Sequence, residues 1–323
     1  SFRRQDLLDN RHPNYIGDVG IGINPPLAER VRKADLVVAI GARLGEMTSG
    51  GYTLFPIPHS SRRLVHVHPS PEELGRVYQA DLMINSGMAE FAKLAANLPP
   101  VDSTRWRNET HRARDEYLAN LKHGKMPGSL DLGEVMAFLR RRLPEDAILT
   151  NGAGNYSGWV QRFYQYTGFR TQLAPTNGAM GYGVPSGVAA KLVHPDRVVV
   201  SFSGDGCFTM NGQELATAAQ YELPVLFIVI NNQMYGTIRM HQEREYPARV
   251  YATALRNPDF AALARAYGLH GEIVTKTAEF EGAFERAMAC GKPALLELRI
   301  DPEAITTRTT LAAVRDQAVK AGR

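Results

Sequence analysis

Two predominantly apolar segments constrain the fold of this chain more than any other feature. They cover residues 198–202 and 225–230, and a helical stretch that opens at residues 211–214 lies between them. Continuous apolar strands are typical of parallel sheets, which are covered on both faces. A strand, a helix and a second parallel strand form a right-handed crossover. The carboxyl ends of both strands therefore meet at one edge of the sheet, where open α/β sheets bind ligands.

The same alternation runs through the rest of the chain and indicates two domains. Further strands are expected at residues 36–40, 64–68, 147–149 and 294–300. Helices are expected at residues 26–32, 71–77, 88–97, 132–142, 212–221, 258–267 and 278–289. A polar, charged stretch between the two series is typical of a linker with a solvated helix. The pattern predicts the α/β class, with two doubly wound parallel-sheet domains.

Composition excludes several classes of partner. Lys and Arg number 37 and Asp and Glu 33, a net charge of +4 with no run of five basic residues. We therefore expect no nucleic-acid and no membrane partner, and a bound anionic cofactor instead. Cys207 and Cys290 lack the spacing of zinc or disulfide frameworks, so a cytoplasmic location is expected. Because the chain does not begin with Met, we expect it to start partway along its gene product.

Polar residues follow each of the two apolar strands at the point where it ends. Asp205 lies between Gly204 and Gly206, and Asn231 and Asn232 end the second strand. A carboxylate oxygen, an amide oxygen and a nearby backbone carbonyl are ligands that suit Mg²⁺ carrying a diphosphate. Glycines let backbone amides approach the phosphates. Each motif alone is also an ordinary turn or loop, but their spacing across one βαβ unit favours a metal and diphosphate site.

These motifs resemble the signature of thiamine diphosphate enzymes. Residues 204–206 together with 231–232 carry that resemblance, and residues 178–185 (GAMGYGVP) resemble the acetolactate synthase-like subgroup. The resemblance implies a homodimer or homotetramer with active sites between subunits. It also implies a partial central domain at residues 1–100, a linker and helix at 101–130, and the diphosphate-binding domain at 131–323.

The resemblance also implies roles for individual residues. Asp205, the Asn232 side chain and the Met234 carbonyl would bind Mg²⁺, and Met180 would be an apolar wedge that bends the cofactor. His241 would line the substrate pocket, at a position where biosynthetic acetolactate synthases carry tryptophan. The residues implied in cofactor binding are Gly154, Asn155, Tyr156, Gly178, Met180, Asp205, Gly206, Cys207, Asn232, Met234, Tyr235, Gly236 and Ile238.

Weaker signals leave three alternatives open. Residues 152–154 follow a strand as in a dinucleotide-binding fold, but the third glycine of GxGxxG is displaced, which disfavours an NAD site. Residues 41–45 lie where flavin-binding relatives hold FAD, yet His66 and His68 stand where many of them carry acidic residues, so FAD binding stays open. The two histidines could also form a metal pair; satisfied surface histidines are the favoured interpretation.

The resemblance finally sets the expected reaction. It implies Mg²⁺-dependent decarboxylation of a small 2-oxo acid by thiamine diphosphate, with possible carboligation. A simple decarboxylase or acyl-CoA lyase of the same family, a non-catalytic cofactor-binding module, and an NAD-dependent dehydrogenase are the alternatives. The family's essential glutamate belongs to an amino-terminal pyrimidine domain that we do not find in this sequence. We therefore expect this chain alone to be inactive.

Overall fold

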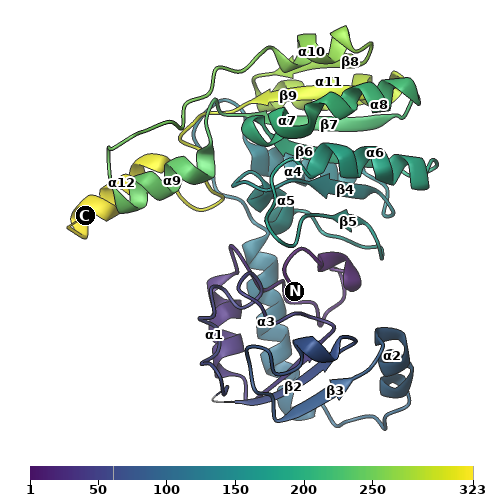
Figure 1. The fold of residues 1–323 in the computed structure, drawn as a ribbon, viewed down its shortest axis with the longest axis vertical. Helices are drawn as coiled ribbons and strands as arrows, with labels where there is room; N and C mark the ends of the chain where they lie inside the picture. Colours follow the sequence, from purple (N-terminus) through teal and green to yellow (C-terminus); the bar gives the residue numbers. More distant parts are fainter. Residues whose placement is uncertain (61, 323) are drawn as a thin grey trace. The chain divides into compact units, whose positions relative to one another are not determined.

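The computed structural model describes residues 1–60 and 62–322, and the chain divides into two compact units (Figure 1). The first unit holds residues 1–5 and 10–120, and the second holds residues 6–9 and the chain from Leu121 on. Each unit is built on a wholly parallel sheet. The prediction of two α/β units with parallel sheets is confirmed. Within the described residues, no helix combines the length and apolar character needed to cross a membrane.

The first unit has a three-stranded sheet in the order β1-β2-β3. Its strands are β1 (Leu36–Ile40), β2 (Arg63–His68) and β3 (Leu82–Asn85), and its helices are α1 (Pro25–Lys33), α2 (Met88–Ala96) and α3 (Arg107–Asn120). Short 3₁₀ turns occur at Gln5–Leu7, Pro71–Glu73 and Thr104–Trp106. The helix predicted at 71–77 is therefore only one turn. Gly75, at φ +75°, follows it in a conformation that a helix cannot continue.

The second unit has a six-stranded sheet in the order β5-β4-β6-β7-β9-β8. Its strands are β4 (Ile148–Asn151), β5 (Gln172–Leu173), β6 (Val199–Gly204), β7 (Val225–Asn231), β8 (His270–Val274) and β9 (Ala294–Arg299). Its helices are α4 (Leu132–Arg142), α5 (Ser157–Phe163), α6 (Gly183–Val193), α7 (Asp205–Asn211), α8 (Leu215–Gln220), α9 (Gly236–Glu245), α10 (Phe260–Ala266), α11 (Thr277–Ala289) and α12 (Leu311–Lys320), with a 3₁₀ turn at Gly212–Glu214.

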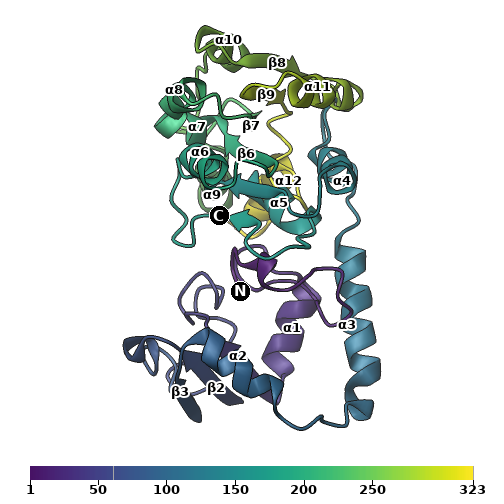
Figure 2. The same ribbon diagram turned by 90° about the vertical axis from the view of Figure 1, so that its right-hand side faces the viewer.

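Alternate residues of the central strands pack into two cores, one on each face of this sheet. Val200 and Ile228 belong to the core under α4, α5 and α11, whereas Val199 and Phe227 belong to the core under α6, α8 and α10. Figure 2 shows α4 and α11 on one side of the strands and α6 and α8 on the other. Because both faces are covered, β6 and β7 are buried along their whole length, as their predominantly apolar sequences predict.

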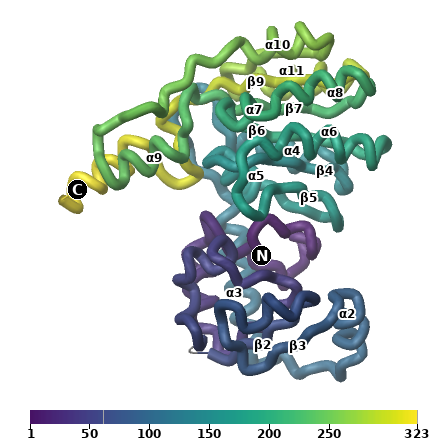
Figure 3. The backbone as a smooth tube through the Cα atoms, in the orientation of Figure 1, coloured from purple at the N-terminus to yellow at the C-terminus, as the bar shows by residue number. Residues whose placement is uncertain are grey.

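Helices α9 and α12 pack against each other at a distance from the sheet, as the tube in Figure 3 shows. Met240 from α9 and Leu311 and Val314 from α12 form a small separate core with Ile305. The loop that leaves the carboxyl end of β7 leads directly into α9. This pair of helices therefore flanks the edge of the sheet at which ligands are expected.

A close approach at Gly183 fixes helix α6 against the sheet. A Cβ atom at this position would lie 2.7 Å from the Phe202 carbonyl oxygen and 3.0 Å from the Gly152 amide nitrogen. Backbone atoms cannot yield as a flexible side chain can. We expect Gly183→Ala to lower the free energy of unfolding by about 1 to 3 kcal/mol, as overpacking does.

The matched control is Gly158→Ala on α5. A Cβ there would meet only the Thr307 methyl group, at an ordinary 3.7 Å. Alanine favours a helix over glycine by up to about 1 kcal/mol, so the control should be neutral or stabilising. Urea denaturation of both variants checks the prediction. Equal stabilities would contradict the close packing at Gly183.

Candidate functional site

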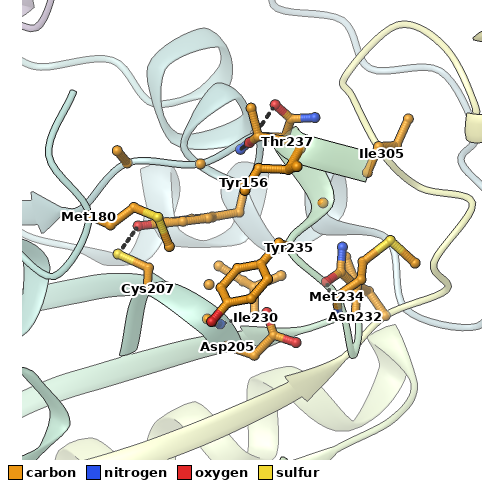
Figure 4. A pocket seen from close by; sticks show the side chains of 18 of the residues that line it. Tyr156, Met180, Asp205, Cys207, Ile230, Asn232, Met234, Tyr235, Thr237 and Ile305 are labelled. Carbon is orange, nitrogen blue, oxygen red and sulfur yellow. Dashed lines mark hydrogen bonds between the residues drawn. The ribbon is translucent and has the colours of Figure 1, made fainter. Parts of the chain in front are cut away.

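A pocket opens where β4, β6 and β7 end, within the second unit (Figure 4). Its walls come from the turn after β4, the loop before α6, the start of α7, the loop between β7 and α9, and the segment after β9. Twelve of the fourteen predicted site residues line it. They are Gly154, Asn155, Tyr156, Met180, Asp205, Gly206, Cys207, Asn232, Met234, Tyr235, Gly236 and Ile238. The structure therefore gathers predicted residues that are spread from Gly154 to Ile238 in the sequence, as the topology requires.

Asp205 is the first residue of α7 and is only 3% exposed. Its Oδ1 accepts a hydrogen bond from its neighbour's amide, Gly206 N, over 2.9 Å, and its Oδ2 accepts one from Asn257 Nδ2 over 2.8 Å. Burial raises the pKa of the Asp205 carboxyl above its ordinary value, and these hydrogen bonds offset part of the rise. The sequence pattern suggested that the helix after β6 opens near residue 211, but α7 already begins at Asp205. Asp205 is thus a buried group that a cation would stabilise.

The loop between β7 and α9 carries the other two predicted metal ligands. Gln233, at φ +57°, turns this loop, and Met234 N donates to Asn232 Oδ1 over 3.3 Å. Backbone hydrogen bonds hold the loop from outside, since Tyr235 N donates to the Thr253 carbonyl over 2.9 Å. In Figure 4, Asn232 and Met234 lie together on one side of the pocket, with Asp205 nearer its centre.

This donor set suits Mg²⁺ better than a transition metal. Within residues 1–60 and 62–322, no three His, Cys, Asp or Glu side chains cluster to hold a metal by themselves. Asp205 carries the only carboxylate among the residues that line the pocket, and Asn232 adds an amide oxygen. Mg²⁺ is usually bound by one or two carboxylates together with phosphate oxygens and water. The residues present therefore fit a magnesium ion that arrives with a diphosphate.

The turn after β4 offers backbone groups to the same pocket. Gly154 adopts φ +150°, and Asn155 is held by Thr237, whose Oγ1 accepts from Asn155 N and donates to Asn155 Oδ1, each over 3.0 Å. Gly206 faces Tyr235 so closely that an added Cβ would lie 2.6 Å from the tyrosine ring. A side chain would therefore not fit at position 206, where the backbone amide donates to Asp205 Oδ1.

Cys207 joins three of the loops that form the pocket. Its Sγ accepts hydrogen bonds from Tyr156 OH over 3.4 Å and from Gly181 N over 3.1 Å. The sequence suggested only a small space-filling residue. Because Gly181 directly follows Met180, this contact also fixes the backbone beside the predicted wedge. Met180 itself is partly buried and packs against the larger core of the unit.

Two predicted site residues lie outside the lining of the pocket. Gly178 adopts φ +76° in a turn in which its amide donates to the Pro175 carbonyl. His241 is exposed on α9, where its Nδ1 lies 3.3 Å from an Arg244 guanidinium nitrogen. Their roles toward cofactor and substrate stay predictions from the family resemblance.

Sequence reasoning missed several residues that line the pocket. Thr237 orients Asn155, and Trp159, Ile230, Ile300, Ala304 and Ile305 form the apolar part of the wall. Ala304 and Ile305 follow β9, about seventy residues beyond Asn231 and Asn232. They carry no local motif, so their place in the site depends on tertiary structure alone.

His66 and His68 are buried, and their predicted surface location is wrong. They are 2% and 8% exposed, and their ring nitrogens lie within hydrogen-bonding distance of the Ala42 and Ser70 carbonyl oxygens, respectively. They lie on one face of β2, where the segments that follow β1 and β2 contact their rings and help to bury them. The prediction that their polar atoms are satisfied agrees with these contacts.

Comparison with known proteins finds two matching families. Residues 152–298 match the family described as "Thiamine pyrophosphate enzyme, C-terminal TPP binding domain", and residues 1–94 match "Thiamine pyrophosphate enzyme, central domain". Pyrophosphate and diphosphate name the same group. The first match contains nearly all of the pocket described above.

Among curated proteins, similar chains are large subunits of acetolactate synthase. Isozyme 2 from Escherichia coli is 30% identical over 293 residues, which are 90% of this chain and 52% of that protein. The Porphyra purpurea subunit is 29% identical over 279 residues, 84% of this chain and 46% of the relative. A probable subunit from Methanocaldococcus jannaschii is 27% identical over 302 residues, 90% and 50% respectively. The chain thus spans about half the length of these relatives.

Proposed function

The chain belongs to the thiamine pyrophosphate enzymes, and on that premise we propose that it forms the Mg²⁺- and diphosphate-binding part of an enzyme that decarboxylates a 2-oxo acid. In this proposal residues 1–100 are a partial central domain, 101–130 a linker with a helix, and 131–323 the diphosphate-binding domain. The similarity to acetolactate synthase large subunits supports carboligation as the step after decarboxylation. A flavin at residues 41–45 stays a prediction from resemblance alone.

One observation carries the proposal: a buried carboxylate and a hard amide oxygen meet beside a glycine-rich turn at the carboxyl edge of the sheet. Asp205, Asn232 and the Met234 carbonyl would hold Mg²⁺, while the turn at Gly154 would let phosphate oxygens approach the backbone. Mg²⁺ prefers hard oxygen ligands such as these. Backbone amides at a helix start or in a glycine-rich turn favour the phosphate groups that Mg²⁺ carries.

The residues of this chain would bind and orient the cofactor. Thiamine diphosphate supplies, when bound, the carbon nucleophile and the electron sink that allow a 2-oxo acid to lose CO₂. Met180 would place an apolar side chain against the cofactor, and Cys207 would fix the backbone beside it through Gly181 N. The apolar wall that includes Ile230 and Ile305 would exclude water from the reacting centre.

The proposed site is completed by a domain that supplies the essential glutamate of the family. Roughly half the length of the acetolactate synthase relatives has no counterpart in this chain. Exposed apolar side chains near the pocket, namely Tyr182, Met210 and Ile238, would be covered by that domain from the same or a second subunit. The assembled enzyme would be a homodimer or homotetramer.

Calorimetric titration tests the proposal. Thiamine diphosphate added in Mg²⁺ should bind to the chain in a one-to-one ratio, and the binding should be lost in EDTA. NAD⁺, the cofactor of the dehydrogenase alternative, should give no heat under the same conditions. Binding of NAD⁺, or thiamine diphosphate binding that ignores the metal, would overturn the proposal.

Met180→Ala tests the wedge. In the enzyme assembled with its pyrimidine domain, we expect kcat for decarboxylation to fall roughly tenfold or more, because a cofactor displaced by about 1 Å can lose up to about a hundredfold in rate. The affinity for thiamine diphosphate should change far less, because the metal and diphosphate contacts are intact. Steady-state kinetics against cofactor concentration separate the two effects. Equal losses in both would reduce Met180 to a packing residue.

A further inference from the structure

The side chain of Asn257 connects the two segments that carry the proposed metal site. Its Nδ2 donates to Asp205 Oδ2 over 2.8 Å and to Asn231 Oδ1 over 2.9 Å. Both hydrogens of the amide are therefore used. Asn257 lies just before α10, about fifty residues from Asp205 in sequence, and its own segment carries no part of the metal motif.

Asn231 is oriented in turn by a fully buried carboxylate. Glu297, on β9, is 0% exposed, and its Oε1 accepts a hydrogen bond from Asn231 Nδ2 over 2.8 Å. The same carboxylate accepts hydrogen bonds from Phe260 N over 3.0 Å and from Arg299 Nε over 2.8 Å. Because Asn231 must turn its amino group toward Glu297, its carbonyl oxygen faces Asn257 and also accepts from Gln233 N.

We propose that Asn257 is the positioning residue for the metal-binding carboxylate of Asp205, held in place by Glu297 through Asn231. This inference rests on the proposed function and adds to it a residue outside the metal motif. Each oxygen of an ionised carboxylate accepts about two hydrogen bonds or ligands. One bond from Gly206 N and one from Asn257 fix both oxygens of Asp205 while leaving each with acceptor capacity for a cation.

The hydrogen bonds to Asn231 also fix the loop between β7 and α9 relative to Asp205. Asn231 Oδ1 holds both Asn257 Nδ2 and Gln233 N, and Gln233 directly precedes Met234, the proposed carbonyl ligand. The buried side-chain amide of Asn231 thus orients Asn257, and through it the Asp205 carboxylate, and it also orients the backbone of the loop at Gln233. Partners that orient metal ligands in this way typically change metal affinity about 10- to 100-fold when removed.

The test measures metal binding directly. Mn²⁺ replaces Mg²⁺, and its electron paramagnetic resonance signal reports free and bound metal in the presence of thiamine diphosphate. The variants are Asn257→Ala and Asn257→Leu, which keeps most of the volume but lacks the donors. The control is Gln220→Ala, an exposed amide at the end of α8. The melting temperature of each metal-free chain is measured in parallel.

We expect both Asn257 variants to bind Mn²⁺ about 10- to 100-fold more weakly than the wild type, with the control unchanged. A purely structural role would lower the melting temperature of the metal-free chain and leave the Mn²⁺ dissociation constant of the folded protein unaltered. That result would overturn this inference and leave the proposed function standing. Tighter Mn²⁺ binding would do the same, because it would mean that Asn257 competes with the metal for Asp205. If the wild-type chain binds no Mn²⁺, or if Asp205→Ala leaves its Mn²⁺ site intact, the proposed function is wrong and this inference is wrong with it.

Discussion

Asp205→Ala should abolish Mg²⁺-dependent binding of thiamine diphosphate, with a loss of roughly 100-fold or more in affinity. The estimate follows because partners that merely orient a metal ligand already account for about 10- to 100-fold. Among the described residues, no second carboxylate lines the pocket to replace Asp205. Calorimetry in Mg²⁺ measures the loss.

The fold should survive this substitution. Burial raises the pKa of the Asp205 carboxyl, so at neutral pH its charge opposes folding in the absence of metal. Removing that charge should leave the melting temperature of the metal-free chain within a few degrees of the wild type. Asp196→Ala is the matched control, because Asp196 is exposed and lies before the start of β6, whereas Asp205 follows the end of that strand. Unchanged cofactor affinity in Asp205→Ala would exclude this residue from the metal site.

Glu243→Ala should strongly destabilise the second unit, although Glu243 lies outside its sheet. Its carboxylate is 1% exposed on α9 and accepts hydrogen bonds from Arg239 on the same helix and from Arg315 on α12, at 2.7 to 3.0 Å. Removing one partner of a buried charge network typically costs about 3 to 5 kcal/mol, and we expect the lower end, because the Arg239 and Arg315 side chains are 18% and 33% exposed and water can solvate them. Denaturation in urea measures the cost, and Glu245→Ala, exposed on the same helix, is the control.

The same network predicts a pH dependence. Hydrogen bonds from Arg315 are the main cause that lowers the pKa of Glu243 from 4.5 to about 2. A lowered folded-state pKa stabilises the fold above the unfolded value, so the contribution is complete above about pH 4.5 and is lost as the pH falls toward 2. Its size is roughly 3 kcal/mol, at about 1.4 kcal/mol per pKa unit. An identical acid-unfolding profile in Glu243→Gln would contradict this assignment.

The sequence predicted what depends on local pattern. Strands β6 and β7 were predicted because they are buried on both faces, and a long apolar run is the direct result of that environment. The two-residue strand β5 and the strand β8 lie at the edges of the sheet, and their mixed sequences give no comparable signal. The start of α7 was also missed, because Gly204 and Asp205 have the composition of a turn.

The metal ligands were predictable, whereas their supports were not. Asp205 and Asn232 follow predicted strands, so topology alone brings them to one edge. Asn257, Glu297 and Ile305 reach the site from segments that carry no motif of their own, and only tertiary contacts reveal them. His66 shows the converse error, since a polar residue on a short strand was placed at the surface although its neighbours bury it.

The position of the metal ion tests the proposed site most directly. Crystals of the chain grown with thiamine diphosphate and Mn²⁺ in place of Mg²⁺ would locate the ion through its anomalous scattering. We expect one peak at about 2 Å from an Asp205 carboxylate oxygen, Asn232 Oδ1 and the Met234 carbonyl oxygen, with the diphosphate beside Gly206. A peak remote from Asp205, or a diphosphate bound without metal elsewhere on the sheet, would contradict it.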